Sequence, residues 1–156
     1  MSHAVIRRVL TDLNSCLSPS VRMLSCYAFG YECSEEPKAD DGTPIPIDTY
    51  INNGLCHAYA LLARARLKEM GIDCHLTGSP THVWIEWEGE WFDSAGTPET
   101  RWPHDQLFDY DDRKTLVAEF PFVYEALIVL SMALEVTPSE HNWAWLAKYT
   151  LRELDD

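Results

Sequence analysis

The chain has 156 residues, enough to bury the core of one domain and too few for two, so we expect a single domain over residues 1–156. Its 25 acidic side chains outnumber the 12 basic ones and give a formal charge of -13, so phosphate backbones would be repelled and nucleic acid is a poor partner. The amino-terminal residues lack the apolar stretch of a signal peptide, and the apolar run over residues 120–136 is interrupted and short for a membrane span. We therefore expect a cytoplasmic protein without a membrane partner.

The five cysteines stand at irregular spacing, without a CxxC pair. In a reducing compartment, an odd number of cysteines indicates free thiols rather than a disulfide framework. Cys16, Cys26, Cys33 and Cys74 have apolar neighbours, and we expect them to be small core residues. Cys56 differs because it opens a predicted helix.

Helices are predicted for the amino-terminal region, residues 3–30. An apolar stripe at helical spacing indicates a helix over residues 3–17. The stripe consists of Ile6, Val9, Leu10, Leu13, Cys16 and Leu17. Ser18-Pro19 is typical of the start of a second helix. Residues 34–48 collect acidic side chains and prolines, which favours an irregular surface loop.

One helix and two strands are predicted next. Strong helix formers over residues 55–70 indicate a helix that Gly71 ends. Alternating apolar and polar residues then indicate half-buried strands over residues 72–77 and 82–87, joined by a four-residue turn.

The remaining elements begin with a hairpin. Glu88-Gly89-Glu90 indicates a tight turn into a short third strand over residues 91–94, which completes an antiparallel meander. Residues 97–114 are polar and broken by proline, which favours a long loop with one helical turn. Residues 122–135 and 138–154 are predicted helices of a carboxy-terminal region, and a capping box stands at the start of the second. Together the elements predict an α+β fold, with helices packed around a small antiparallel sheet.

Element lengths bring Cys56, His82 and Asp93 to one place. The helix rises about 24 Å and carries the chain away from Cys56. Six extended residues return it roughly 20 Å, so that His82 begins its strand near the level of Cys56. In a two-residue hairpin the numbers of opposed residues sum to an odd number, so Asp93 lies on the same face as His82, Trp84 and Glu86. A three-residue loop without a bulge would reverse that face.

These residue types suit nucleophilic attack on an amide. A thiol in the first turn of a helix faces unpaired N–H groups and the positive end of the dipole, which stabilise the thiolate of Cys56. His82 can take the thiol proton and return it to a leaving amine, while Asp93 fixes the other ring nitrogen. The N–H of Cys56, with an amide of Asn52 or Asn53, is a candidate oxyanion site. The two asparagines suit a turn and a helix cap better than the oxyanion role.

The stretches "GLCHAYALLARARLKEMGI", "THVWIEW" and "GEWFDSAG" resemble the core of the transglutaminase-like superfamily. In that papain-like arrangement a Cys begins a helix, and His and Asp follow on adjacent strands. The matching residues, within about residues 50–97, are Gly54, Cys56, His82, Val83, Trp84, Trp91 and Asp93. The resemblance implies that Cys56 is the nucleophile, His82 the general base and Asp93 the orienting acid.

The resemblance further implies a cysteine hydrolase or acyltransferase that acts on a protein or peptide amide through a thioester, without a cofactor or metal. Two features depart from the family. His57 stands where an aromatic residue often follows the cysteine, and the interval of 26 residues from Cys56 to His82 is shorter than usual. Because the superfamily includes proteases, amidases, deamidases and transglutaminases, the resemblance indicates the chemistry and not the substrate.

Other interpretations apply to several of these residues. Trp84 suits shielding of the His82 pair, a substrate groove or simple packing. His57 projects about 100° around the helix from Cys56, so we expect a neighbour rather than a partner. The pairs Cys56-His57 and Cys74-His75 suggest zinc, but adjacent strand residues point to opposite faces and the spacing fits no structural zinc pattern. A non-catalytic protein-binding module on the same fold is the other alternative, and the complete set of three residues argues against it.

Overall fold

The computed structural model describes residues 2–20, 24, 41–43, 45–52, 54–98, 101–136 and 142–155. The helices are α1 (Ser2–Leu17), α3 (Ile47–Ile51), α4 (Cys56–Glu69), α5 (Arg113–Glu119), α6 (Val123–Val136) and α7 (Trp143–Asp155), with 3-10 helices η1 (Ser18–Ser20) and η2 (His104–Gln106). The strands are β1 (His75–Ser79), β2 (His82–Trp87), β3 (Glu90–Phe92) and β4 (Phe108–Asp109). They form one antiparallel sheet in the order β3-β2-β1-β4. The predicted α+β class is confirmed.

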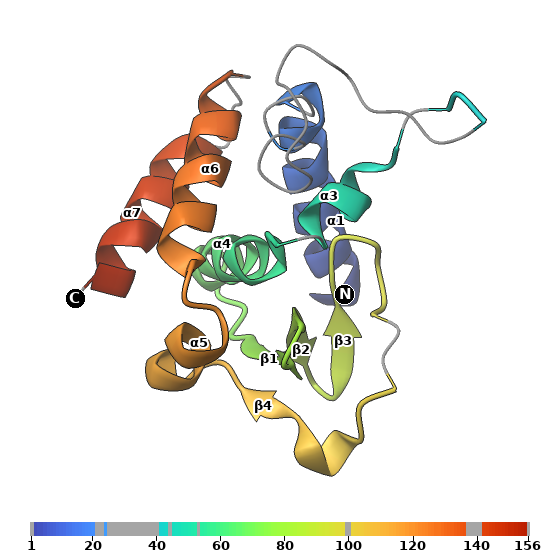
Figure 1. Ribbon diagram of the computed structural model, residues 1–156, viewed down its shortest axis with the longest axis vertical. Coiled ribbons are helices and arrows are strands. Elements are labelled where there is room, and N and C mark those ends of the chain that lie inside the picture. Colours follow the sequence, from blue (N-terminus) through green and yellow to red (C-terminus); the bar gives the residue numbers. More distant parts are fainter. Residues whose placement is uncertain are drawn as a thin grey trace.

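Helix α4 lies between the sheet and the other long helices (Figure 1). It contacts α1, α6 and α7 as well as β1 and β2. A helix in that position is apolar on almost every side, and the residues from Leu55 to Ala63 are all buried. The prediction of a helix over residues 55–70 is confirmed to within one residue at each end, and Gly71 follows it with φ of 82°.

The amino-terminal prediction is confirmed for α1, whose predicted apolar stripe is buried throughout. Of the predicted second helix, η1 and the helical residue Leu24 are described, and residues 21–23 and 25–30 lie outside the described residues. The predicted loop is wrong at its end because α3 already begins at Ile47 and buries Tyr50 and Ile51. Residues 34–40 and 44 of that loop lie outside the described residues.

The sheet register confirms the predicted parity. Glu88 and Gly89 alone separate β2 from β3, and both have positive φ, 48° and 79°, as a two-residue hairpin turn requires. Ile85 then pairs with Phe92. The first predicted strand is displaced, because β1 starts at His75 and runs to Ser79, where residues 72–77 were expected. Only Pro80 and Thr81 separate it from β2.

The carboxy-terminal half contains two elements within the predicted loop of residues 97–114 and a third, α5, that begins at the end of that loop. The single helical turn is confirmed as η2. Strand β4 was not expected, and it pairs with β1 at Thr77 and Gly78. Helix α5 was also not expected, and the Asp112 side chain caps it by accepting from the Lys114 N–H at 3.3 Å.

The last two helices were largely expected. Helix α6 is shifted by one residue from its predicted start and end. Helix α7 begins at Trp143 rather than Pro138, after Asn142 with φ of 52°, and the predicted capping box over residues 137–140 lies outside the described residues. Within the described residues, no single helix combines the length and apolarity needed to span a membrane, and α5 and α6 reach them jointly only across an 88° bend.

Gly78 lies where β1 passes the first residue of β2, and a Cβ atom there would lie 2.0 Å from the backbone oxygen of His82. We expect Gly78→Ala to lower the free energy of unfolding by about 1–3 kcal/mol, because the extra carbon forces the two strands apart. Urea unfolding measures this change. Gly89→Asn is the matched control, since a Cβ atom at Gly89 would have no neighbouring atom within 4 Å and Asn tolerates a positive φ. An equal loss in both variants would contradict a steric cause at Gly78.

Candidate active site

The three candidate residues occupy the starts and ends of neighbouring elements. Cys56 is the first residue of α4, His82 is the first residue of β2, and Asp93 directly follows β3. His82 Nε2 and Asp93 Oδ2 are 2.9 Å apart. The Cys56 thiol donates to the Thr81 carbonyl oxygen at 4.0 Å, which places the sulfur beside the residue before His82. Since Asp93 occupies Nε2, Nδ1 is the ring nitrogen of His82 left for the sulfur.

Asp93 is held from several sides. Its second carboxylate oxygen accepts from the Ala95 N–H at 2.9 Å, and its backbone bonds Gly96 in both directions, at 2.7 and 3.0 Å. Asn14 of α1 donates to the Ser94 carbonyl at 2.9 Å and accepts from the Tyr59 hydroxyl of α4 at 2.5 Å. These bonds tie the turn after β3 to α1 and α4, so the carboxylate that orients His82 has a fixed position.

The electrostatics of the site favour a charged pair. Burial raises the pKa of Cys56, but the neighbouring His57 and His82 rings, the His82 charge and the Val83 N–H together outweigh it and lower that pKa to about 6. Burial lowers the pKa of His82, but its hydrogen bonds to Asp93 and Cys56 and the negative charges of both partners raise it to about 9. Between these two values the pair exists as thiolate and imidazolium.

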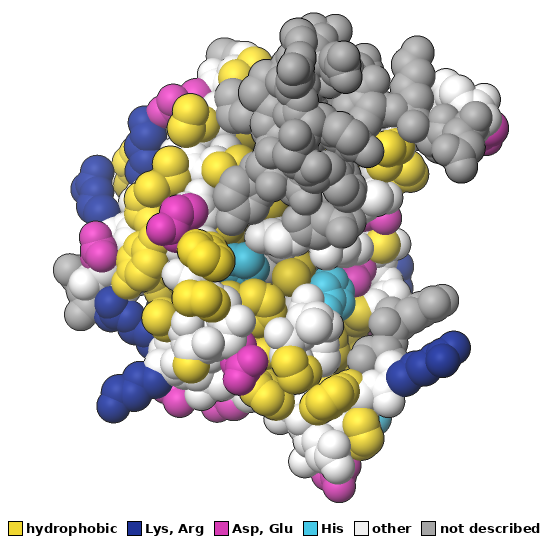
Figure 2. Space-filling view, viewed as in Figure 1, with side chains coloured by type: hydrophobic (Ala, Val, Ile, Leu, Met, Phe, Trp, Pro, Cys, Tyr) yellow, Lys and Arg dark blue, Asp and Glu magenta, His cyan; other side chains and the backbone are white. Residues whose placement is uncertain are grey.

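The site is largely enclosed. Cys56 is 3% exposed and Asp93 7%, whereas the His82 side chain is 20% exposed, so a ligand arriving from solvent meets His82 first. Figure 2 shows histidine side chains near the middle of one face of the molecule, with hydrophobic side chains around them.

Aromatic rings extend from His82 across the sheet. The His82 and Trp84 ring centroids are 5.6 Å apart, those of Trp84 and Trp91 are 4.9 Å apart, and Trp91 stacks on His104 at 4.5 Å. Trp84 is completely buried, so the expectation of a half-buried second strand is wrong at this position. The neighbouring aromatic rings explain this, because they cover the face that the alternation left open to solvent. Trp84 is therefore packed between the His82 and Trp91 rings.

Asn52 does not cap α4. Leu55 is the N-cap residue of α4 and makes no side-chain cap, whereas Asn52 ends α3 and its backbone N–H donates to Asp48 O at 2.9 Å. That backbone group is therefore not free to act as an oxyanion donor. The Asn52 side-chain oxygen accepts from the Ser94 hydroxyl at 3.4 Å. Asn53 lies outside the described residues.

His57 was expected to be a neighbour of Cys56 rather than a partner, and it lies in the first turn of α4. Its proximity helps to lower the pKa of the Cys56 thiol. Its ring is 3% exposed and stacks on Phe120, with centroids 4.7 Å apart. The only sequence signal for the nearness of His57 to the thiol is its position directly after Cys56.

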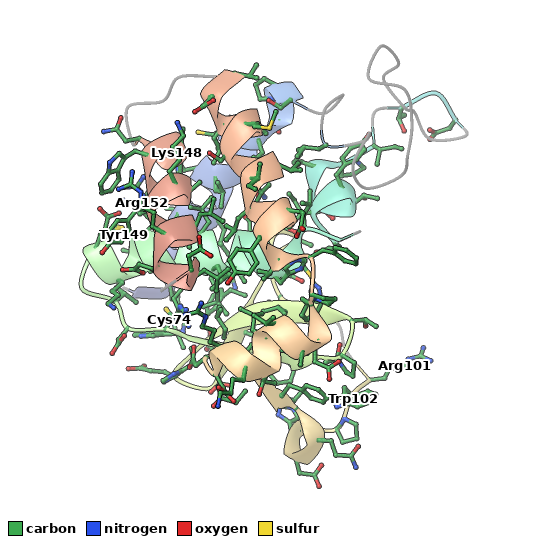
Figure 3. All side chains as sticks on the ribbon, turned by 60° about the vertical axis from the view of Figure 1, so that its left-hand side comes forward. Cys74, Arg101, Trp102, Lys148, Tyr149 and Arg152 are labelled. Carbon is green, nitrogen blue, oxygen red and sulfur yellow. The ribbon has the colours of Figure 1, made fainter. Side chains whose placement is uncertain are left out.

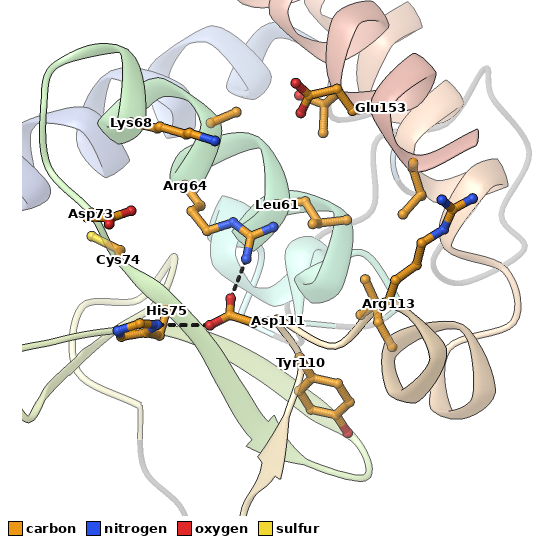
Figure 4. A pocket seen from close by; sticks show the side chains of 14 residues that line it. Leu61, Arg64, Lys68, Asp73, Cys74, His75, Tyr110, Asp111, Arg113 and Glu153 are labelled. Atoms are coloured by element: carbon orange, nitrogen blue, oxygen red, sulfur yellow. Dashed lines mark hydrogen bonds and ion pairs between the residues drawn. The ribbon is translucent and has the colours of Figure 1, made fainter. Parts of the chain in front are cut away.

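A second cavity, of about 400 Å³, lies away from this site, between α4, the start of β1, α5 and α7 (Figure 4). Asp111 links the residues that line this cavity. Its carboxylate binds Arg64, His75 Nδ1 at 2.9 Å and the Leu76 N–H at 3.0 Å. Cys74 lines the cavity, and burial followed by the charge of Asp73 raises its pKa to about 11. The pKa of Cys74 is thus raised, whereas that of Cys56 is lowered.

Arg101 and Trp102 lie outside both the candidate active site and this cavity. Figure 3 shows Arg101 and Trp102 at the outer edge of the segment before η2, where the Trp102 indole donates to the Gln106 carbonyl at 2.6 Å. Among the described residues, no three His, Cys, Asp or Glu side chains are arranged to hold a metal ion. Comparison of the chain with protein-family models, curated proteins and solved structures gave no match. The assignment of the site therefore rests on its own residues.

Asp93→Asn tests the ion pair. A neutral amide stabilises an imidazolium less than a carboxylate does, so we expect the pKa of His82 to fall below about 9 and that of Cys56 to rise above about 6. Histidine ring shifts in NMR spectra and the pH dependence of thiol alkylation measure the two values. Asp111→Asn is the matched control, because it removes the other His–Asp pair and we expect it to lower the pKa of His75 alone. Unchanged values in Asp93→Asn would contradict the pairing.

Proposed function

We propose that the protein is a cysteine-dependent acyl-transfer enzyme that cleaves an amide bond through a thioester. The series Cys56, His82 and Asp93 carries this proposal. It supplies a thiol of lowered pKa, an imidazole beside it and a carboxylate 2.9 Å from the far ring nitrogen. A nucleophile, a base and a group that orients the base are the three parts that amide cleavage through a covalent intermediate needs.

The chemistry proceeds in two steps. The Cys56 thiolate attacks the carbonyl carbon, a C–S bond forms, and the electron pair of the C=O bond moves to the oxygen. When the oxyanion collapses, the C–N bond breaks and His82 gives its Nδ1 proton to the leaving amine. A water molecule then attacks the thioester while His82 takes its proton, and breaking of the C–S bond releases a carboxylic acid and restores the thiolate.

The N–H groups at the start of α4 support the oxyanion. The first turn of a helix leaves its N–H groups without acceptors inside the helix, and Cys56 is the first residue of α4. The same positive helix end stabilises the thiolate before attack.

The order of Cys at a helix start, His at a strand start and Asp after the next strand agrees with the resemblance to transglutaminase-like enzymes. We infer a protein or peptide amide as substrate and water as the acceptor, which makes the enzyme a protease, amidase or deamidase. Water is preferred to an amine because no amine-binding group is evident beside Cys56 in the described part of the chain. Transglutaminase activity would require one.

Alkylation by iodoacetamide tests the nucleophile without knowledge of the substrate. We expect Cys56 to react before Cys16 and Cys74, with an apparent pKa near 6, because Cys74 has its pKa raised to about 11 and stays protonated. Mass spectrometry of the adducts across pH measures this order. In His82→Ala the advantage of Cys56 is expected to disappear. Equal rates at all cysteines would contradict the assignment.

Hydrolysis of a peptide and acyl-amide library tests the activity. We expect kcat/KM to rise with pH through about 6, as Cys56 loses its proton, and to fall through about 9, as His82 loses the proton that the leaving amine needs. Cys56→Ala should lose all turnover, and Cys74→Ala, the control, should retain it. A library in which no amide is cleaved faster by the unaltered chain than by Cys56→Ala would contradict the proposal.

A second candidate function is a non-catalytic binding module with the same fold. The 3% exposure of Cys56 favours it, because a nucleophile must reach its substrate. The two candidates differ in thiol chemistry, since a binding module needs no thiolate. An inert Cys56 in the alkylation experiment would favour the module.

A further inference from the structure

His57 has an unusual environment for a polar ring. It is 3% exposed, and neither Nδ1 nor Nε2 forms a hydrogen bond of normal geometry with any described atom. Its ring lies nearly parallel to that of Phe120, with an interplanar angle of 20° and centroids 4.7 Å apart. Buried polar atoms are almost always bonded, so two unbonded nitrogens in one ring require an explanation.

The Cys56 sulfur provides that explanation. His57 follows Cys56 in the first turn of α4 and is near enough to lower its pKa, although neither ring nitrogen forms a hydrogen bond of normal geometry with the sulfur. The protonated thiol donates to the Thr81 carbonyl. After ionisation the Cys56 sulfur can only accept hydrogen bonds, so any donor within its reach stabilises the thiolate.

We propose that His57 is a catalytic residue whose ring, held by stacking on Phe120, donates a hydrogen bond to the Cys56 thiolate. It is the second imidazole at the sulfur, on the α4 side, while His82 approaches from β2. The proposal rests on Cys56 being the reactive thiol of the proposed function. It does not depend on which amide, if any, is cleaved.

The two imidazoles have different tasks. His82 bonds Asp93 and passes a proton during the reaction, whereas His57 has no carboxylate bonded to it among the described residues. The other titratable groups that influence Cys56 or lie near it are Asp93 behind His82 and Tyr110, whose pKa is raised by burial, by Glu119 and by Cys56. His57 therefore stabilises the thiolate without transferring the proton.

A donor to the thiolate affects reactivity in two opposite ways. It increases the thiolate fraction at low pH, but it also makes each thiolate less nucleophilic, because nucleophilicity falls with pKa with a slope of about 0.4–0.5. Removal of His57 should therefore slow alkylation at low pH and accelerate it at high pH. A residue with a merely structural role would not make the two rate profiles cross.

The experiment measures iodoacetamide alkylation of Cys56 from pH 5 to pH 9 in the whole chain and in His57→Phe. Phenylalanine removes both nitrogens and keeps a ring to stack on Phe120. For each unit by which the pKa of Cys56 rises, we expect alkylation about 3-fold slower on the low-pH limb and about 3-fold faster on the plateau. Profiles that superimpose, or that shift in rate without crossing, would overturn the proposal.

Two further variants serve as controls. His75→Phe makes the same substitution at an exposed histidine that pairs with Asp111, and we expect its Cys56 profile to match that of the unaltered chain. His57→Gln keeps an N–H donor that does not titrate, and we expect it to retain most of the low pKa of Cys56. A His57→Gln profile with the full shift of His57→Phe would contradict the donor role.

A measurement on the unaltered chain covers the case in which His57→Phe does not fold. NMR of the ring nitrogens should show a His57 shift change in the pH range where Cys56 ionises, and this change should be absent in Cys56→Ser. A His57 signal that ignores Cys56 would overturn the proposal. If the alkylation profiles cross but no amide is cleaved, the donor role of His57 is supported and the proposed enzyme activity is contradicted. If an amide is cleaved by the unaltered chain and not by Cys56→Ala, but the alkylation profiles superimpose, the enzyme activity is supported and the donor role of His57 is contradicted.

Discussion

Packing of α4 against β2 holds the thiol beside the imidazole, and the other features of the site depend on this contact. Buried side chains of both elements, among them Ala58, Leu62, Val83 and Ile85, belong to one hydrophobic cluster. Cys56 and His82 each begin their element at the edge of that cluster. A slide of α4 by one helical turn, about 5.4 Å, would take the sulfur out of reach of His82. Apolar burial distant from the chemistry therefore sets the geometry of the reacting groups.

Burial and polar contacts have opposing effects on the pKa of Cys56, whereas they act together on the pKa of Cys74. Burial is the largest influence on both Cys56 and Cys74 and raises both pKa values. At Cys56 the two histidines and the Val83 N–H reverse the effect, whereas at Cys74 the neighbouring Asp73 adds to it. A buried cysteine is thus made reactive by the donors that surround it, because they replace the water that stabilises a thiolate in solution.

The carboxy-terminal half completes the site from a distance in sequence. The Tyr110 hydroxyl donates to the Ser79 carbonyl at 2.6 Å and so secures the end of β1 just before His82. Phe120 lies between the rings of Tyr110 and His57, at 5.5 and 4.7 Å. Tyr110 directly follows β4 and Phe120 directly follows α5, so these two short elements position both rings.

Local patterns in the sequence are enough to predict the long elements and the register of one hairpin. The apolar stripe of α1, the helix formers of α4 and the two residues Glu88 and Gly89 act locally, so their outcome follows from composition and spacing. The parity of that turn brought Asp93 to the face of His82, and the 2.9 Å contact agrees with it. The function itself was not determined in this way, because the same three residue types serve several acyl-transfer reactions.

Only the tertiary structure decided the short elements and the second histidine. Helix α3 has five residues and β4 has two, too few for a periodic signal, and they form where α1 and β1 offer partners to them. Helical geometry alone places His57 about 100° around α4 from Cys56 and says nothing of the neighbours of its ring. Phe120, 63 positions later in the chain, stacks on that ring. Contacts between residues so far apart in sequence have no local pattern, which is the physical reason that the sequence did not reveal them.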